Sequence, residues 1–218
     1  MPSPAKPIIL AAQDELQDPA GVRWPATELV QHLHEGQRAI AQKRPDTTAT
    51  VVTFSPAAPG ARHTLPAAAA SLIDIPRNAA GRKRAITKVD QVLLDATVRD
   101  WQGMTPSAEV LHFMHDLREP RVFLTYPPAA ATTSLELVYS AYPASTPTAS
   151  GATAATVSGN IDLPDEWATA LRYYVLYRAW SKDAEYGGNA QLAATNYGLF
   201  KAELGEQLES AATVAPAA

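Results

Sequence analysis

The 218-residue chain contains no cysteine, so it can form no disulfide, no thiolate nucleophile and no zinc–thiolate site. An excess of basic charge is also missing, because 18 Lys and Arg stand against 22 Asp and Glu and the net charge is -4. A dedicated nucleic-acid binder needs a strongly basic face. These absences argue against thiol chemistry and against nucleic-acid binding as the main function.

Long apolar runs are missing as well. The apolar run within the N-terminal sequence MPSPAKPIILAAQDEL is too short for a signal peptide. No later run approaches the roughly 20 apolar residues that a transmembrane helix needs. We therefore expect no membrane partner and a protein that is made and used in the cytoplasm. The 46% hydrophobic and 18% charged content fits a soluble globular protein. We expect a single domain over residues 1–218.

Local catalytic motifs are absent too: the chain has no G-x-S-x-G, Walker A, G-x-G-x-x-G or H-E-x-x-H sequence. His32 and His34 lie two positions apart on a predicted helix and point about 200° apart, so they cannot hold one metal together. His112 and His115 lie on opposite faces of a predicted strand, and His63 lies in a turn-rich loop with no evident partner. We expect no catalytic residue, no metal, no cofactor and no enzymatic activity.

The acidic residues near the C-terminus form no catalytic pair either. Asp183 and Glu185 lie two positions apart on a predicted helix and diverge, whereas paired catalytic carboxylates must converge on one substrate atom. Lys182 and Glu185, three positions apart, are typical of a surface ion pair.

Helical periodicity dominates the N-terminal region. A short first helix is expected to end at the Asp-Pro-Ala-Gly turn of residues 18–21. A second helix begins at Pro25 and continues to Arg44, with apolar residues on one face. Together they predict helix over about 8–44.

The stretch from Leu163 to Gly205 predicts two more helices within about 164–210, joined at Gly187 and Gly188. The first of these helices has two apolar stripes at helical spacing where one is usual. One stripe holds Trp167, Leu171, Tyr174 and Val175, and the other holds Ala170, Tyr173, Tyr177, Trp180 and Ala184.

Two stripes on one helix favour two buried faces, one in the monomer core and one against another protein chain. Tyr and Trp are enriched at interface hot spots. We therefore assign Tyr173, Tyr177 and Trp180 to an interface. The alternative is that both stripes pack within one thick monomer core.

The middle of the chain is rich in β-type residues and predicts a small, mostly antiparallel β insertion over about 50–142. Its expected strands are Val51–Phe54, Ser71–Ile75, Ala85–Leu94, Val110–His115, Val122–Tyr126 and Leu135–Tyr142. The uncharged residues 143–160 predict a flexible loop, and the small residues of 211–218 predict a mobile tail. The fold class is α+β, with a helical core made of the N-terminal helices and the C-terminal helix pair.

A short basic run, Arg82, Lys83 and Arg84, follows a predicted turn, with Arg77 before it. Such a run is usually a solvated hairpin tip, and it is too short to neutralise many phosphates. No aromatic residue interleaves with it, so the stacking platform of a single-strand binder is absent. The functional interpretation is a contact with DNA or with an acidic partner.

Several stretches of the chain, in matching order, resemble bacteriophage head–tail adaptor proteins of short-tailed and related phages. The most specific parts are Val22, Arg23 and Trp24 with the helix after them, and the run Tyr177–Tyr186. Other resembling stretches are DIPRNAAGRKRAITKVD and LELVYSAYP. These are structural signatures and not catalytic ones.

The resemblance implies a structural virion protein of the head–tail neck that is assembled in the host cytoplasm. It would form a ring, commonly a dodecamer, between the portal protein and the tail or nozzle proteins. Genomic DNA would pass through the lumen without sequence-specific binding, and Tyr173, Tyr177 and Trp180 would be oligomer or portal contacts.

Two alternatives stay open at this point. The chain could form another neck or tail-completion layer, which is structural but has different neighbours. It could also be a soluble enzyme with a scattered site built from His32, His112 or His115 and distant acids.

Overall fold

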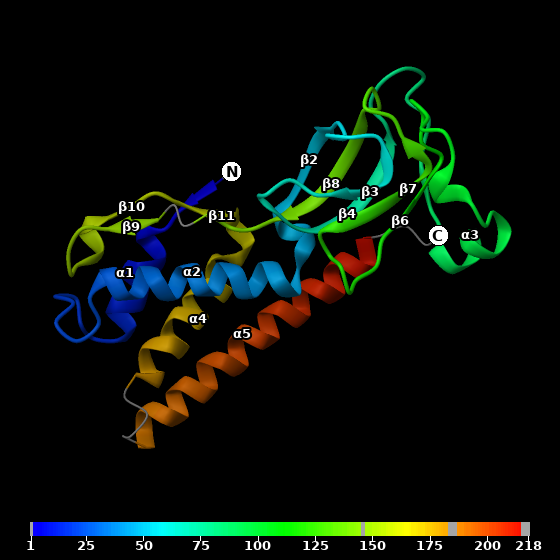
Figure 1. Ribbon diagram of the computed structural model, residues 1–218. Coiled ribbons are helices and arrows are strands. Elements are labelled where there is room, and N and C mark those ends of the chain that lie inside the picture. Colours follow the sequence, from blue (N-terminus) through cyan, green and yellow to red (C-terminus); the bar gives the residue numbers. More distant parts are fainter. Residues whose placement is uncertain (1, 145–146, 183–186, 215–218) are drawn as a thin grey trace. The chain divides into compact units, whose positions relative to one another are not determined.

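The structure is a computed structural model that describes residues 2–144, 147–182 and 187–214. Helices lie near both ends of the chain and strands fill the middle (Figure 1). This arrangement confirms the predicted α+β class.

The chain forms two compact units, the first from Met1–Lys43 and Pro143–Ala218 and the second from Arg44–Tyr142. The first unit contains the helical core, and the second corresponds to the β insertion. We expected one domain with an insertion near residues 50–142; the insertion is a compact unit by itself and begins at Arg44.

The first unit is built from helices α1, α2, α4 and α5 with two short strand pairs. Its elements are β1 (Pro2–Pro4), α1 (Lys6–Glu15), α2 (Ala26–Lys43), β9 (Thr148–Ala149), η3 (Ala154–Thr156), β10 (Val157–Ser158), β11 (Asn160–Pro164), η4 (Asp165–Trp167), α4 (Ala168–Ser181) and α5 (Gly187–Val214). β1 pairs with β11 and β9 with β10, both antiparallel. Helices α1, α2 and α5 all pack against α4, so α4 is the centre of this unit.

Helix α5 is longer than expected. The sequence predicted a helix that ends near residue 210 and a tail after it, whereas α5 continues to Val214. Ala211 and Ala212 have high helix propensity, so the helix can continue through them. The rest of the predicted tail, residues 215–218, lies outside the described residues.

The turn between α1 and α2 is held by the Asp18 carboxylate. It accepts hydrogen bonds from the backbone N–H groups of Val22, Arg23 and Trp24 at 2.8 to 2.9 Å. These bonds, that from Trp24 above all, lower the pKa of Asp18. Gly21 has φ +65°, and a Cβ there would lie 2.1 Å from the Ala152 carbonyl oxygen, so only glycine fits.

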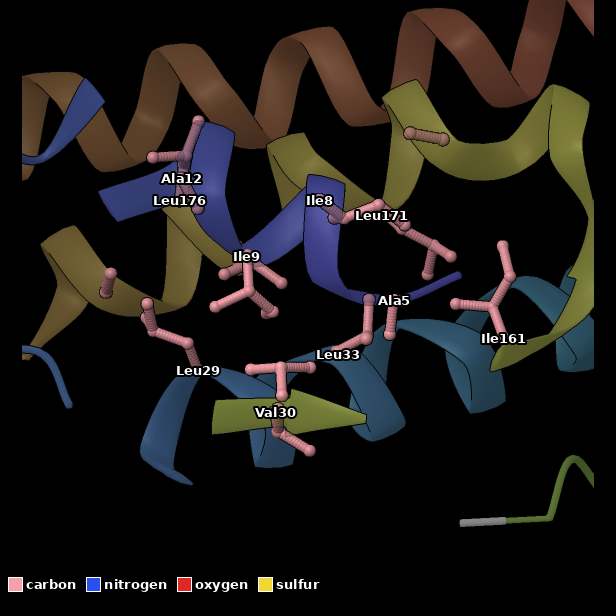
Figure 2. Close-up of a cluster of buried hydrophobic side chains, with 14 of the residues drawn as sticks. Ala5, Ile8, Ile9, Ala12, Leu29, Val30, Leu33, Ile161, Leu171 and Leu176 are labelled. Atoms are coloured by element: carbon pink, nitrogen blue, oxygen red, sulfur yellow. The ribbon is translucent and has the colours of Figure 1, made fainter. Parts of the chain in front are cut away.

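The core of the first unit forms where α1 and α2 meet α4. Figure 2 shows Ile8 and Ile9 of α1 and Leu33 of α2 pointing towards Leu171 and its neighbours. Leu171, with no exposed surface, lies at the centre of this cluster. Gly36 lets α2 and α4 approach each other, because an added Cβ would meet Tyr174 Cδ1 at 3.0 Å and Leu171 Cδ2 at 3.1 Å.

The segment after the β unit is more structured than its composition suggested. Within residues 147–160, β9 and β10 pair, and Ala154 and Val157 are buried in the core. Buried Gln13 anchors it, since its Oε1 accepts from Ala154 N at 2.8 Å and its Nε2 donates to Ala152 O at 2.8 Å. Residues 145–146 of the predicted loop lie outside the described residues, and its flexibility in solution stays a prediction.

The second unit contains two small sheets where one was expected. The three-stranded sheet has the order β2 (Ala49–Phe54), β8 (Leu135–Ala141), β4 (Ala69–Asn78), and the four-stranded sheet has the order β3 (Gly60–Thr64), β7 (Val122–Ala129), β6 (His112–Met114), β5 (Thr87–Lys88). All pairs are antiparallel except β5 with β6. Buried Ile75, Phe113, Phe123 and Leu137 belong to one shared core.

Two predictions within this unit were wrong. Residues Gly60–Thr64 form β3, although the proline-rich sequence around them predicted only turns. The strand expected over Ala85–Leu94 is paired only at Thr87–Lys88. Asp90 then accepts from Val92 N at 2.9 Å and begins helix α3 (Gln91–Thr97), and its N-capping capacity was the signal that sequence reasoning missed.

We predict that Leu171→Ala lowers the free energy of unfolding by about 2 to 5 kcal/mol, because it leaves a cavity in a fully buried site. The matched control is Leu199→Ala on α5, where 41% of the side chain is exposed and less burial is lost. Urea denaturation of both variants measures the difference. Equal losses for the two leucines would contradict the assignment of Leu171 to the centre of the core.

Candidate assembly interface

Within each unit, the described histidines have separate partners. His32 and His34 belong to the first unit, whereas His63, His112 and His115 belong to the second. Each ring in the second unit is used locally: His112 Nδ1 lies 2.7 Å from Thr87 Oγ1, and His115 Nε2 lies 3.2 Å from the Pro120 carbonyl oxygen. The described residues contain no group of three or more His, Asp or Glu side chains placed to hold a metal.

His63 corrects one expectation. The sequence placed it in a loop without a partner, but it lies in β3 with 6% of its surface exposed and its Nε2 is 3.2 Å from Thr125 Oγ1. Its ring also packs at 5.4 Å from that of Phe123. Burial lowers the pKa of His63. It is therefore a satisfied core histidine, and its alternation with buried Ala61 was the available signal.

The first stripe of α4 lies in the core as predicted. Trp167, Leu171 and Val175 have at most 1% of their surfaces exposed, and Tyr174 is partly buried. The same helix also buries Leu176 and Ala179. Helix α4 is therefore covered on more than one side, by α1 and α2 and by α5.

The three aromatic residues of the second stripe are half-buried within the chain itself, Ala170 is fully buried, and Ala184 lies outside the described residues. The Trp180 ring packs edge-on against Trp24 with centroids 5.3 Å apart. The Tyr177 ring lies 4.8 Å from that of Tyr197 on α5, and the Arg172 guanidinium lies over Tyr173 at 5.4 Å. We call Tyr173, Tyr177, Trp180 and Tyr197 the aromatic surface; part of each ring remains accessible, and their interface role stays a proposal.

Ion pairs join α2 to α4 beside this surface. Glu28 Oε2 lies 2.7 Å from Lys182 Nζ, and Glu35 Oε2 lies 2.9 Å from Arg178 Nε. Lys182 was expected to pair with Glu185, but that residue, like Asp183, lies outside the described residues. The partner found for Lys182 is on a different helix, a contact that sequence spacing cannot reveal.

His32 lies between these two ion pairs. Its ring nitrogens are each 3.8 Å from a carboxylate, one from Glu28 and one from Glu35. Burial nevertheless dominates and lowers the pKa of His32, because the charged imidazolium would lose its hydration. The neutral form is therefore favoured in the folded protein.

The basic run lies in the turn between β4 and β5. One of its residues has an acidic partner, since Arg84 Nη1 lies 3.4 Å from Glu109 Oε2. Arg77, before the run in β4, has its Nε 3.7 Å from Glu136 Oε1. Arg82 and Lys83 are exposed and belong to no ion pair within the part of the chain that the structure describes. The structure thus separates two paired cations from two available ones.

Sequence reasoning missed a groove of about 1050 Å³ in the second unit, between α3 and the turn after β6. Val92 and Leu117 line the groove, and they are 74% and 85% exposed. Its rim is charged, with ion pairs Arg62–Glu119 and Arg118–Asp116, both at 2.7 Å. A groove whose lining includes two ion pairs and exposed aliphatic side chains suits a protein contact better than a small polar ligand.

The structure is thus an α+β protein with a half-buried aromatic surface on the first unit and an exposed groove on the second. The model of the SU10 adaptor protein family matches residues 4–218, and the chain belongs to that family. This confirms the resemblance to phage head–tail adaptors. The comparison with curated proteins finds no match.

Family membership makes the chain a structural phage adaptor and a component of the virion that interacts with other phage head and tail proteins. Among the described helices, none has the length and apolar character needed to cross a membrane.

We predict that the protein loses stability as the pH falls below about 6.5, the ordinary pKa of histidine. The folded-state pKa of His32 is lowered, so the unfolded state binds more protons and stability rises with pH across this window. Thermal unfolding between pH 7.5 and 5 should show a smaller loss for His32→Gln than for the wild type. His34→Gln on the same helix is the control, and an unchanged pH dependence in His32→Gln would refute the prediction.

Proposed function

We propose that the protein is a head–tail adaptor that assembles as a ring, commonly of twelve copies, between the portal and the tail or nozzle proteins. The observation that carries this proposal is the family match over residues 4–218. The match covers both compact units of the chain, so neither unit is an accessory addition to an adaptor.

The accessible part of the aromatic surface supports a contact between copies or with the portal. Tyr and Trp contribute large contact area at low entropic cost, and they dominate interface hot spots. Tyr177 and Trp180 are already positioned by Tyr197 of α5 and by Trp24, so few side-chain conformations would be lost on binding.

The charge of the chain supports a conduit for DNA. With a net charge of -4, a ring of copies would not hold DNA through extensive counterion release. Genomic DNA would therefore slide through the lumen without sequence-specific binding.

A different neck layer and an enzyme are the competing functions. Selective binding to portal rings separates the adaptor from another layer. The enzyme hypothesis required His32, His112 or His115 to meet distant acids. The carboxylates beside His32 are those of Glu28 and Glu35 on its own helix, and the described partners of His112 and His115 are a hydroxyl and a carbonyl. We propose that the chain has no catalytic turnover.

The direct test is co-sedimentation of the protein with rings of its portal. We predict that Tyr177→Ala weakens ring formation or portal docking by about 2 kcal/mol or more, with a smaller effect on monomer unfolding. Leu171→Ala should do the reverse.

Trp180→Ala should also weaken assembly, but its contact with Trp24 adds a stability loss. Tyr177→Phe is the matched control, because it keeps the ring contact with Tyr197. If Tyr177→Ala unfolds the monomer as severely as Leu171→Ala and leaves docking unchanged, both stripes belong to the monomer core.

A further inference from the structure

Strand β2 is an open edge of the three-stranded sheet. The sheet order is β2, β8, β4, so β8 pairs with one side of β2 (Figure 1) and, among the described residues, no strand pairs with the other. Residues 50–54 also have no backbone hydrogen bond to any described segment outside this sheet. Alternate residues of an antiparallel strand point their N–H and C=O groups away from the partner strand. About half of the backbone groups of β2 therefore face outwards without a partner strand.

β2 lacks the features that usually block such an edge. Natural edge strands are kept from pairing with other chains by charged residues, proline, bulges or short length. The sequence of β2, ATVVTF, contains no charged residue and no proline. All six residues pair with β8 in continuous register, from Ala49↔Ser140 to Phe54↔Leu135, without a bulge. The backbone of β2 is therefore regular and open to another strand.

The other edge strands of the second unit are blocked. β4 departs from regular register at three places, and its Leu72 N–H donates outside the sheet, to the Pro120 carbonyl oxygen at 3.0 Å. β3 has a break in register between Gly60 and Arg62, and the Arg62 side chain is charged. β5 is two residues long. Irregular, charged or short edges resist strand addition, so β2 differs in kind from the other edges of its unit.

The described strands of the first unit offer no comparable edge. β9 and β10 have two residues each. β1 has three residues, two of them proline, and its register with β11 is irregular. β11 contains the charged Asp162 and ends at Pro164. Within the described structure, β2 is thus the one strand whose free edge is long, regular, uncharged and without proline.

We propose that β2 accepts an extended segment of a different virion protein as an additional strand of its sheet. The inference rests on the proposed function and names one contact surface and the kind of partner that it fits. A second copy of this chain does not supply the strand, because its other edges are short, irregular, charged or interrupted by proline. Pairing of β2 with β2 uses the one free edge of both copies, so it joins two copies and cannot repeat around a ring.

The side chains of β2 define what the added strand must carry. Val52 and Phe54 are partly buried against the core of the second unit, so every second residue of an added strand would extend this apolar border. On the opposite face, Val51 is 61% exposed. Because β2 offers no charge to pair with, an uncharged segment with apolar residues at alternate positions fits best. Backbone hydrogen bonds would provide affinity, and the alternate side chains would provide specificity.

The test mixes the whole chain with purified portal rings and, separately, with purified tail or nozzle proteins. Val51→Lys places a lysine on the edge, where it opposes strand addition, and the exposed side chain that it replaces contributes little to the fold. Val51→Thr keeps an uncharged β-branched residue. The control, Ile73→Lys, adds the same charge at the opposite edge of the sheet, in β4, where the register is already broken. Thermal unfolding checks that each variant is folded.

Val51→Lys should weaken binding to the partner protein by tenfold or more, whereas Val51→Thr and Ile73→Lys should bind like the wild type. Amide hydrogen exchange over residues 49–54 should slow by tenfold or more in the complex, because the outward N–H groups of β2 gain acceptors. A contact made by side chains alone gives these N–H groups no acceptor, so hydrogen exchange separates strand addition from ordinary surface contact.

The contrary outcomes are distinct. If the wild type binds a partner protein, but Val51→Lys binds equally well and exchange over residues 49–54 stays fast, strand addition is wrong and the adaptor function stands. If exchange over these residues slows in the protein alone as its concentration rises, a second copy occupies the edge and the proposal is wrong. If the wild type binds neither portal rings nor tail or nozzle proteins, the proposed function fails and strand addition fails with it.

Discussion

The burial of α4 is the interaction on which the first unit depends. Leu171, Val175 and Leu176 have no exposed surface, and α1, α2 and α5 all reach the same helix. Such a helix cannot have one apolar and one polar face, because it is buried on several sides. Gly36 allows α2 to lie close to α4, since an added Cβ would stand 3.0 Å from Tyr174 Cδ1 and 3.1 Å from Leu171 Cδ2, and these side chains would have to shift. Every other helix of the unit takes its position from this contact.

The sequence allowed the helices of the first unit and the α+β class to be predicted because their signals are local and long. The turn at Asp18 and the glycine pair at Gly187 bound periodic runs on either side. Strand β3 was missed because its pairing with β7 is distant in sequence, and prolines around it favoured turns. For the candidate site, the sequence predicted which residues take part but not what they contact. No local pattern shows that Trp24 packs against Trp180 or that Glu28 pairs with Lys182.

The aromatic surface stabilises the chain, and the role that we propose for it in assembly would use the same rings. Tyr177 and Trp180 stabilise the chain through Tyr197 and Trp24, and their remaining accessible area is what an interface can use. Two apolar stripes on one helix therefore do not require two separate partners, because Tyr197 of α5 contacts Tyr177 and Trp24 contacts Trp180 within the chain. An adaptor would benefit from such an arrangement, because rings fixed before assembly reduce the entropy lost on docking.

We propose that this member of the SU10 adaptor family assembles on a portal, and native mass spectrometry of purified portal rings mixed with the protein tests this proposal. We expect a discrete complex in which a fixed number of copies, equal on every ring, is added to the portal. Portal rings that keep their own mass at every protein concentration would contradict it.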